Sequence, residues 1–209
     1  VIIVASLGIF YIFSKKYAAS YYFAKGIYSF NSESDLTKAE DNILKAVNFD
    51  SQDRYFRGLT EIGLFKMQRT INNSSLSADD LRAEFQRNLS ATIKYAQQAI
   101  SVNNLDPLNW INMAKVYESV LPLKIEGAAN LALNNYIEAA KRDPNNPDNF
   151  NVMLNVYDYN DKLVFESEME NRLNFYFGSP EYYWATKSDI NPSFGRYKKI
   201  ATAESADGN

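Results

Sequence analysis

The chain has 209 residues, a net charge of −3 and neither cysteine nor histidine. Without cysteine it has no disulfides, thiolate nucleophiles or cysteine-based metal sites, and without histidine it has no imidazole base or ligand. We therefore expect no metal, no cofactor and no catalytic residue. No basic stripe indicates nucleic-acid binding. The 46% apolar content supports a hydrophobic core, and the low glycine and proline counts favour helices.

The first residues form an apolar run, VIIVASLGIFYIF, which ends at Ser14-Lys15-Lys16. A helix of this length spans about 20 Å, less than the roughly 30 Å of a hydrocarbon core. We expect residues 1–16 to be the end of a longer transmembrane helix and a membrane anchor, with Tyr11 and the two lysines at the interface. The alternative is a buried core helix.

The clearest pattern begins at Trp110 and combines aromatic, small and proline residues at fixed spacing. Small residues let two antiparallel helices approach closely, aromatic residues fill the space between them, and proline ends the second helix. The positions are Trp110, Ala114, Tyr117, Ala132, Tyr136, Ala139 and Pro144. Their order and spacing resemble the tetratricopeptide repeat. Filling of an inter-helix pocket by Trp110 predicts a cost of about 3–5 kcal/mol for Trp110→Ala.

The pattern starts again forty residues later, with Phe150 and Tyr157 in the positions of Trp110 and Tyr117. The repeat is about 34 residues long. The extra residues are expected in a loop around 121–127.

Upstream segments fit earlier units of the same kind. Residues 39–46 and 92–99 carry small residues at the spacing of second helices, and residues 55–62 are expected to form the first helix between them. Residues 71–80 are a polar stretch, so we expect a loop there and a helix starting near Leu81. Residues 21–28 are expected to form the opening helix, joined to the apolar run.

The expected fold is all-α. It is an α-solenoid of about three tetratricopeptide-like helix-turn-helix units with a closing helix, preceded by the end of a transmembrane helix. The expected divisions are the anchor 1–16, the repeat array 17–158, a closing helix with an aromatic-rich cap at 159–200 and a disordered tail 201–209. A plain antiparallel helical bundle is the alternative.

A narrower resemblance covers roughly residues 17–158, most clearly residues 106–147, and includes the segment 53–59. The segments Asn109-Trp110, 116–119, Pro122-Leu123, 126–128 and 143–147 resemble the C-terminal repeat region of bacterial membrane proteins of the O-antigen ligase or polymerase family. In that family a multi-spanning membrane part precedes the repeats and carries the glycan transfer chemistry. The resemblance implies a non-catalytic accessory domain at a bacterial cell membrane. It is compatible with the outer face, whereas Lys15-Lys16 favours the cytoplasmic face.

Repeat arrays of this kind bind protein or peptide partners along the concave face formed by their first helices. Amide side chains can bond a ligand backbone, and cations can meet a carboxylate. The candidate contacts near the aromatic positions are Arg57, Asn112, Lys115, Asn151 and Asn155. The alternative is an ordinary solvated helix face.

Two other functions remain open. The first is a free-standing membrane-anchored scaffold for assembly of an envelope complex. The second is a glycan hydrolase that uses Glu166 and Glu170, which share one face of an expected helix. The aromatic segment 175–184 is expected to cap the last unit or to stack on a sugar or partner.

Overall fold

The computed structural model describes residues 2–144 and residue 146, and over these residues the fold is all-helical. The expected all-α class is thereby confirmed for this part of the chain. The elements are α1 (Ile2–Asn31), α2 (Leu36–Phe49), α3 (Asp53–Ile71), α4 (Ala78–Val102), α5 (Pro107–Glu118), the short 3-10 helix η1 (Leu121–Leu123) and α6 (Ala128–Arg142).

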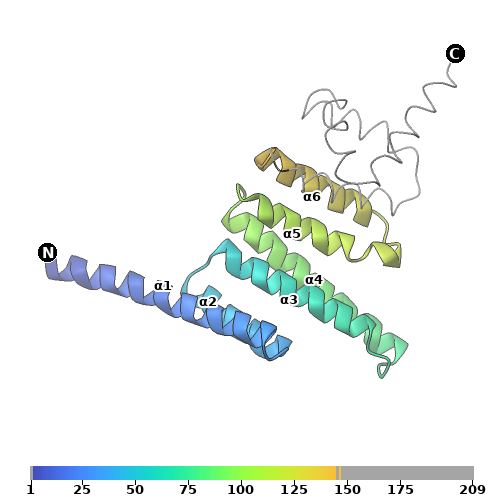
Figure 1. Ribbon diagram of the computed structural model, residues 1–209, viewed down its shortest axis with the longest axis horizontal. Coiled ribbons are helices and arrows are strands. Elements are labelled where there is room, and N and C mark those ends of the chain that lie inside the picture. Colours follow the sequence, from blue (N-terminus) through green and yellow to red (C-terminus); the bar gives the residue numbers. More distant parts are fainter. Residues whose placement is uncertain (1, 145, 147–209) are drawn as a thin grey trace, which may run out of the picture. The chain divides into compact units, whose positions relative to one another are not determined.

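Consecutive helices pair as hairpins: α1 with α2, α3 with α4 and α5 with α6 (Figure 1). Each hairpin meets the next through its second helix, because α2 also contacts α3 and α4 also contacts α5. The first helices contact one another as well, α1 with α3 and α3 with α5. The helices therefore stack in chain order.

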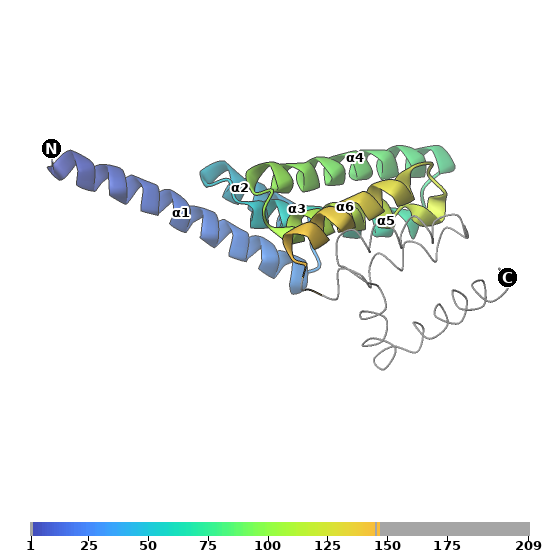
Figure 2. The ribbon, with the colours of Figure 1, turned by 90° about the horizontal axis from the view of Figure 1, so that it is seen from above.

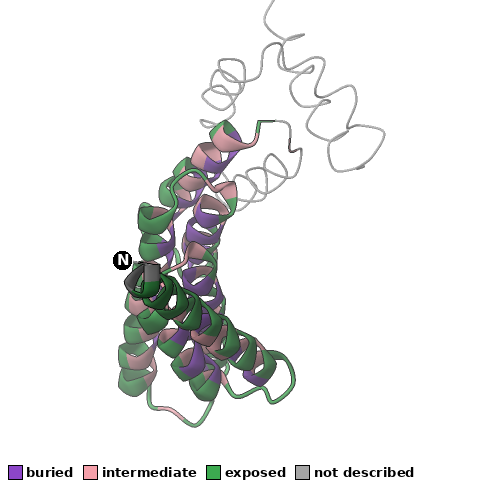
Figure 3. Ribbon diagram, turned by 90° about the vertical axis from the view of Figure 1, so that its left-hand side faces the viewer, coloured by how far each residue is buried: buried purple, intermediate pink, exposed green. Residues whose placement is uncertain are grey.

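The three second helices bury equivalent positions. In each of them the residues at i, i+4 and i+7 have no exposed surface. These residues are Ala39, Ile43 and Ala46 in α2, Thr92, Ala96 and Ala99 in α4, and Ala132, Tyr136 and Ala139 in α6. Figure 3 shows the buried residues on the sides where helices face each other. The predicted second helices at 39–46 and 92–99 are confirmed.

Small residues on the first helices mark the points of closest approach. A β-carbon on Gly26 would lie 2.5 Å from Cγ1 of Ile43, so α1 and α2 leave no room for a side chain there. Gly63 faces Thr92 in the second hairpin in the same way, and Ala114 in α5 has no exposed surface. Gly26 and Gly63 are thus the counterparts of Ala114 on the other two first helices, and the sequence pattern does not identify them.

The start of α4 corrects the expected loop at 71–80. The helix begins at Ala78, three residues before Leu81, because the Ser77 hydroxyl accepts a hydrogen bond from the Asp80 amide. Asp79 and Asp80 occupy the first turn, where acidic side chains favour the positive end of the helix dipole. These two acids therefore belong to the helix and stabilise its start.

The connection between α5 and α6 lies at 119–127, where the sequence predicts a loop. The 3-10 helix η1 follows α5, and Lys124 then adopts a left-handed conformation with φ of 53°. Gly127 precedes α6 with φ of 79°, a value that glycine adopts without strain. These residues form a connection after which α6 packs against α5.

Helix α1 joins the apolar run to the first hairpin without a break. Its first half projects past the end of α2 (Figure 2). Residue 3 and residues 6–14 are all exposed there, whereas Ala19 and Gly26 further along are buried. The expected boundary at residue 16 thus falls inside a helix. No helix in the described part of the chain meets the length and apolarity needed to cross a membrane.

Candidate partner-binding face

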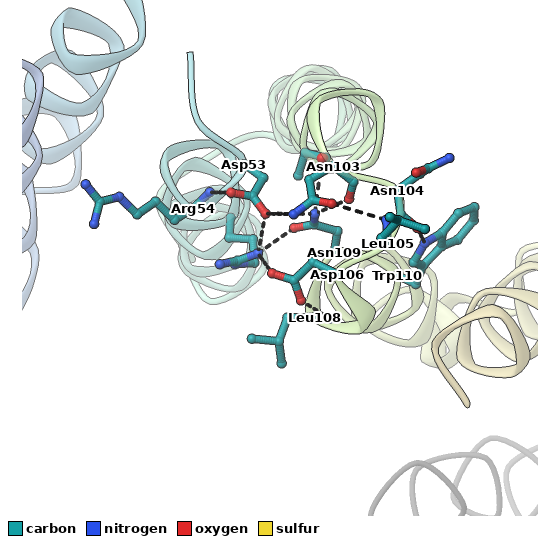
Figure 4. Close-up of polar contacts among 11 residues, drawn as sticks. Asp53, Arg54, Asn103, Asn104, Leu105, Asp106, Leu108, Asn109 and Trp110 are labelled. Atoms are coloured by element: carbon teal, nitrogen blue, oxygen red, sulfur yellow. Dashed lines mark hydrogen bonds and ion pairs between the residues drawn. The ribbon is translucent and has the colours of Figure 1, made fainter. Parts of the chain in front are cut away.

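A network of polar side chains joins α3 to the start of α5 (Figure 4). One nitrogen of Arg57, Nη1, donates to Asp53 at 3.0 Å, to Asp106 at 2.7 Å and to the Oδ1 of Asn109 at 2.7 Å. Asp106 is also the N-cap of α5, where its carboxylate accepts from the Leu108 amide at 2.9 Å. The carboxylate that starts one helix is therefore paired with an arginine of the previous hairpin.

Asn109 is the centre of this network and has no exposed surface. Its Nδ2 donates to Asp53 at 3.1 Å and to the carbonyl oxygens of Ala99 at 3.2 Å and Asn103 at 2.6 Å. The Ala99 and Asn103 carbonyls lie at the end of α4, where the Ala99 carbonyl also accepts from the Asn103 amide at 3.0 Å. Asn109 thus ties together α3, α4 and α5.

Asp53 is charged at neutral pH in this setting. Burial acts to raise its pKa, but the hydrogen bond from Asn109, the amide of Arg54 and the charge of Arg57 outweigh burial and hold the pKa below its usual value. Its side chain is 18% exposed. The network is therefore a largely desolvated set of charged and amide groups in which each named group has a partner.

Arg57 was expected on the partner-binding face as a cation for a ligand carboxylate. The structure instead places its guanidinium, 21% exposed, against the carboxylates of Asp53 and Asp106 in the chain itself. Asn112 is 9% exposed and so has little surface for a partner. Lys115 is exposed. Of the described candidates, Lys115 is the one that presents its side chain to solvent.

Lys115 shares its helix face with two apolar side chains. Leu108, Ile111 and Lys115 occupy positions i, i+3 and i+7 and therefore lie on one side of α5. Leu108 is 51% exposed and Ile111 is partly exposed. On α3, Phe65 is 52% exposed and its ring contacts that of Phe30 on α1 edge to face at 5.0 Å. The first helices therefore present apolar groups beside charged ones, because the exposed Glu61 and Arg69 lie one turn to either side of Phe65 on α3.

Trp110 lies at the edge of the third hairpin and is only partly buried. Its indole nitrogen donates to the carbonyl of Asn104 at 2.9 Å. The guanidinium of Arg142 stacks on the indole ring at 4.3 Å and donates to the same carbonyl. Trp110 therefore does not fill the expected inter-helix pocket: the Asn104 carbonyl holds its indole nitrogen, and Arg142 at the end of α6 covers its ring at the surface.

A second polar contact joins the first two hairpins. The Glu40 carboxylate on α2 forms an ion pair with Lys66 on α3 and accepts a hydrogen bond from the Tyr95 hydroxyl on α4 at 3.1 Å. Burial, the charge of Glu40 and this hydrogen bond raise the pKa of Tyr95 to about 12. Glu40 therefore links three helices, as Asn109 does at the next junction.

Several expected residues lie outside the described part of the chain. They are Phe150, Asn151, Asn155, Tyr157, Glu166, Glu170 and the aromatic segment 175–184. Among the residues that the structure does describe, no group of three or more acidic side chains is arranged to hold a metal ion. Neither a protein-family model nor a curated protein sequence matches the chain.

Proposed function

We propose that the chain is a non-catalytic protein-interaction domain, an α-solenoid of tetratricopeptide-like units held at a membrane through the start of α1. The observation that carries this proposal is the equivalence of the three hairpins. The same three positions of each second helix are buried, and each first helix carries a buried glycine or alanine, which lies at a close contact with the second helix in the first two hairpins. A plain bundle has no reason to repeat these positions three times.

The polar junctions support stacking of units in one direction. Glu40 and Asn109 each connect a hairpin to its neighbour through side chains that are far apart in sequence. Such contacts fix how one hairpin sits on the next, which is what a solenoid needs to keep a continuous face for a ligand. The partner is a peptide or protein segment lying across the first helices, with Lys115 pairing with an acidic group and Leu108 with an apolar one.

The start of α1 supports the membrane tether. Ile3, Leu7, Phe10 and Phe13 are each at least 63% exposed on a helix that continues into the array. Large exposed apolar side chains are costly in water and favourable in lipid. By the resemblance of residues 106–147, the array is the accessory part of a glycan ligase or polymerase-type protein of a bacterial cell membrane.

Panning the whole chain against a displayed library of random peptides tests the interaction function. Peptides selected on the wild type should lose about tenfold or more in affinity for Lys115→Glu, because a cation in contact with a ligand carboxylate is replaced by a like charge. The matched control is Lys94→Glu at an exposed position of α4. Peptides that bind both variants as tightly as the wild type would place their site elsewhere and contradict the proposed face.

Flotation with lipid vesicles tests the tether. The chain should rise with vesicles, and Phe10→Glu with Phe13→Glu should leave it in the dense fraction while its helical circular dichroism is unchanged. A wild-type chain that stays in the dense fraction contradicts the tether and leaves the interaction function to the peptide experiment.

A further inference from the structure

One face of α1 carries a line of large exposed side chains along the whole helix. Ala19 has no exposed surface and packs in the core shared by the first two hairpins. At 3.6 residues per turn, positions 3, 10, 17, 21 and 28 all lie within about 20° of the side opposite Ala19. The exposed fractions are 77% for Ile3, 71% for Phe10, 76% for Tyr17, 56% for Tyr21 and 60% for Tyr28. We call these five residues the outer stripe.

The outer stripe changes in chemistry along the helix. It begins with aliphatic and phenyl side chains and continues with three tyrosines beside the first hairpin. A tyrosine has an apolar ring and a polar tip, and such rings are enriched where lipid meets water. The end unit of a repeat array ordinarily presents a polar outer face to solvent. Three exposed tyrosines on that face indicate a surface that is covered.

The charge of α1 indicates what covers it. The helix contains Lys15, Lys16 and Lys25 and no acidic residue. The first acid after it, Glu33, is paired with Lys38 at 2.8 Å. The ammonium of Lys15 lies over the ring of Tyr11 at 5.6 Å. At 100° per residue, Lys25 lies about 60° from the outer stripe, whereas Lys16 and Lys15 lie about 120° and about 140° from it. Lys25 is therefore the cation nearest the headgroups, and the helix as a whole, with three lysines and no acid, complements a bilayer surface that carries anionic lipids.

We propose that α1 lies along an anionic bilayer surface with the outer stripe toward the headgroups. The first hairpin then rests against the lipid over the length of α1, about 45 Å for 30 residues. The inference rests on the proposed tether and adds to it the orientation of the array. If α1 stood upright instead, Tyr28 would be about 27 Å further from the membrane than Phe10 along the helix axis.

Single cysteines distinguish these orientations, because the chain has no cysteine of its own. Polarity-sensitive fluorophores are attached at Phe10→Cys, Tyr21→Cys and Tyr28→Cys, with Leu105→Cys, 76% exposed, as the control. With phosphatidylcholine vesicles containing phosphatidylglycerol, the first three emissions should shift to the blue and the fourth should not. A shift at position 10 alone overturns the inference and leaves the tether standing. No shift at any position overturns both.

A matched pair of triple variants measures the contribution of the stripe. Tyr17, Tyr21 and Tyr28 are replaced by serine in one variant, and the exposed Leu105, Leu108 and Leu123 in the other. Partitioning onto the anionic vesicles should fall about tenfold or more for the first and stay unchanged for the second. Equal partitioning of both variants overturns the inference. So does a blue shift at positions 21 and 28 that appears without vesicles and grows with protein concentration, since a second copy then covers the stripe.

Discussion

A β-carbon on Gly63 would lie 2.1 Å from Oγ1 of Thr92, well inside the contact distance of two atoms. The two residues mark the crossing of α3 and α4. Gly63→Ala should lower the free energy of unfolding by about 1–3 kcal/mol, because the helices must move apart and lose contacts around the crossing. Urea denaturation followed by circular dichroism measures this change.

The control for this variant is Gly8→Ala, since nothing lies within 4 Å of a β-carbon at Gly8. This substitution should leave stability unchanged or raise it by up to about 1 kcal/mol through helix propensity. Adding Thr92→Ala to Gly63→Ala should restore part of the loss, because it removes the atoms that clash. Equal effects of the two glycine substitutions would show that α3 and α4 do not cross at Gly63.

Replacing Tyr136 with alanine should lower the free energy of unfolding more than replacing Trp110 does, although tryptophan is the larger residue. Tyr136 has no exposed surface and its hydroxyl donates to Glu118, so Tyr136→Ala should cost about 3–5 kcal/mol. Trp110 is partly exposed and stacked under Arg142, so Trp110→Ala should cost about 1–2 kcal/mol rather than the 3–5 kcal/mol that the repeat pattern suggests. A larger loss for Trp110→Ala in urea denaturation would place Trp110 in the core.

Asp53→Asn should destabilise the chain at neutral pH and much less in acid. The pKa of Asp53 is lower in the folded chain than its ordinary value, so its stabilising effect is present above about pH 3.9 and is lost as pH falls through the folded pKa. We expect a loss of about 1–2 kcal/mol at pH 7. The difference in unfolding free energy between the variant and the wild type should be smaller in acid than at pH 7. Asp41→Asn, at an exposed position of α2, is the control, and a gap independent of pH would contradict the assignment.

Tyr95→Phe should remove part of the loss of stability in alkali. The folded pKa of Tyr95 is about 12 and an unfolded tyrosine titrates near 10. The corresponding stability is therefore fully present below about pH 10 and is lost as pH rises toward 12. The variant should be about 1 kcal/mol less stable at pH 7, because Glu40 loses a hydrogen bond, but should lose less on going to alkali. The exposed Tyr17→Phe is the control; identical slopes for Tyr95→Phe and wild type would contradict the expectation.

The sequence was most informative about the second helices. Alanine at i, i+4 or i+7 marks a surface that another helix touches. This signal is local, so it predicts the helices at 39–46 and 92–99 without knowledge of the fold. The start of α4 was missed because two aspartates after a serine look like loop residues until Ser77 is seen as the cap. Local composition does not distinguish a polar loop from the acidic first turn of a helix.

The junctions between hairpins were not predictable in the same way. Arg57 and Asn109 are 52 positions apart, and their partners depend on how one hairpin rests on the next. Arg57 beside an aromatic residue resembled a ligand contact, whereas the fold uses it to neutralise Asp106 at the start of α5. One signal was available: an aspartate followed by Pro107 is a typical helix start, which marks Asp106 as a cap.

The unbroken course of α1 has a mechanical consequence. Its backbone hydrogen bonds continue from the apolar residues into the first hairpin, and Ala19 and Gly26 are held in contact with the neighbouring helices. A twist applied at the apolar end therefore cannot be absorbed by a flexible joint before it reaches Gly26. Rotation of the apolar end about the helix axis would therefore exert a torque on the contact between Gly26 and Ile43 near the other end.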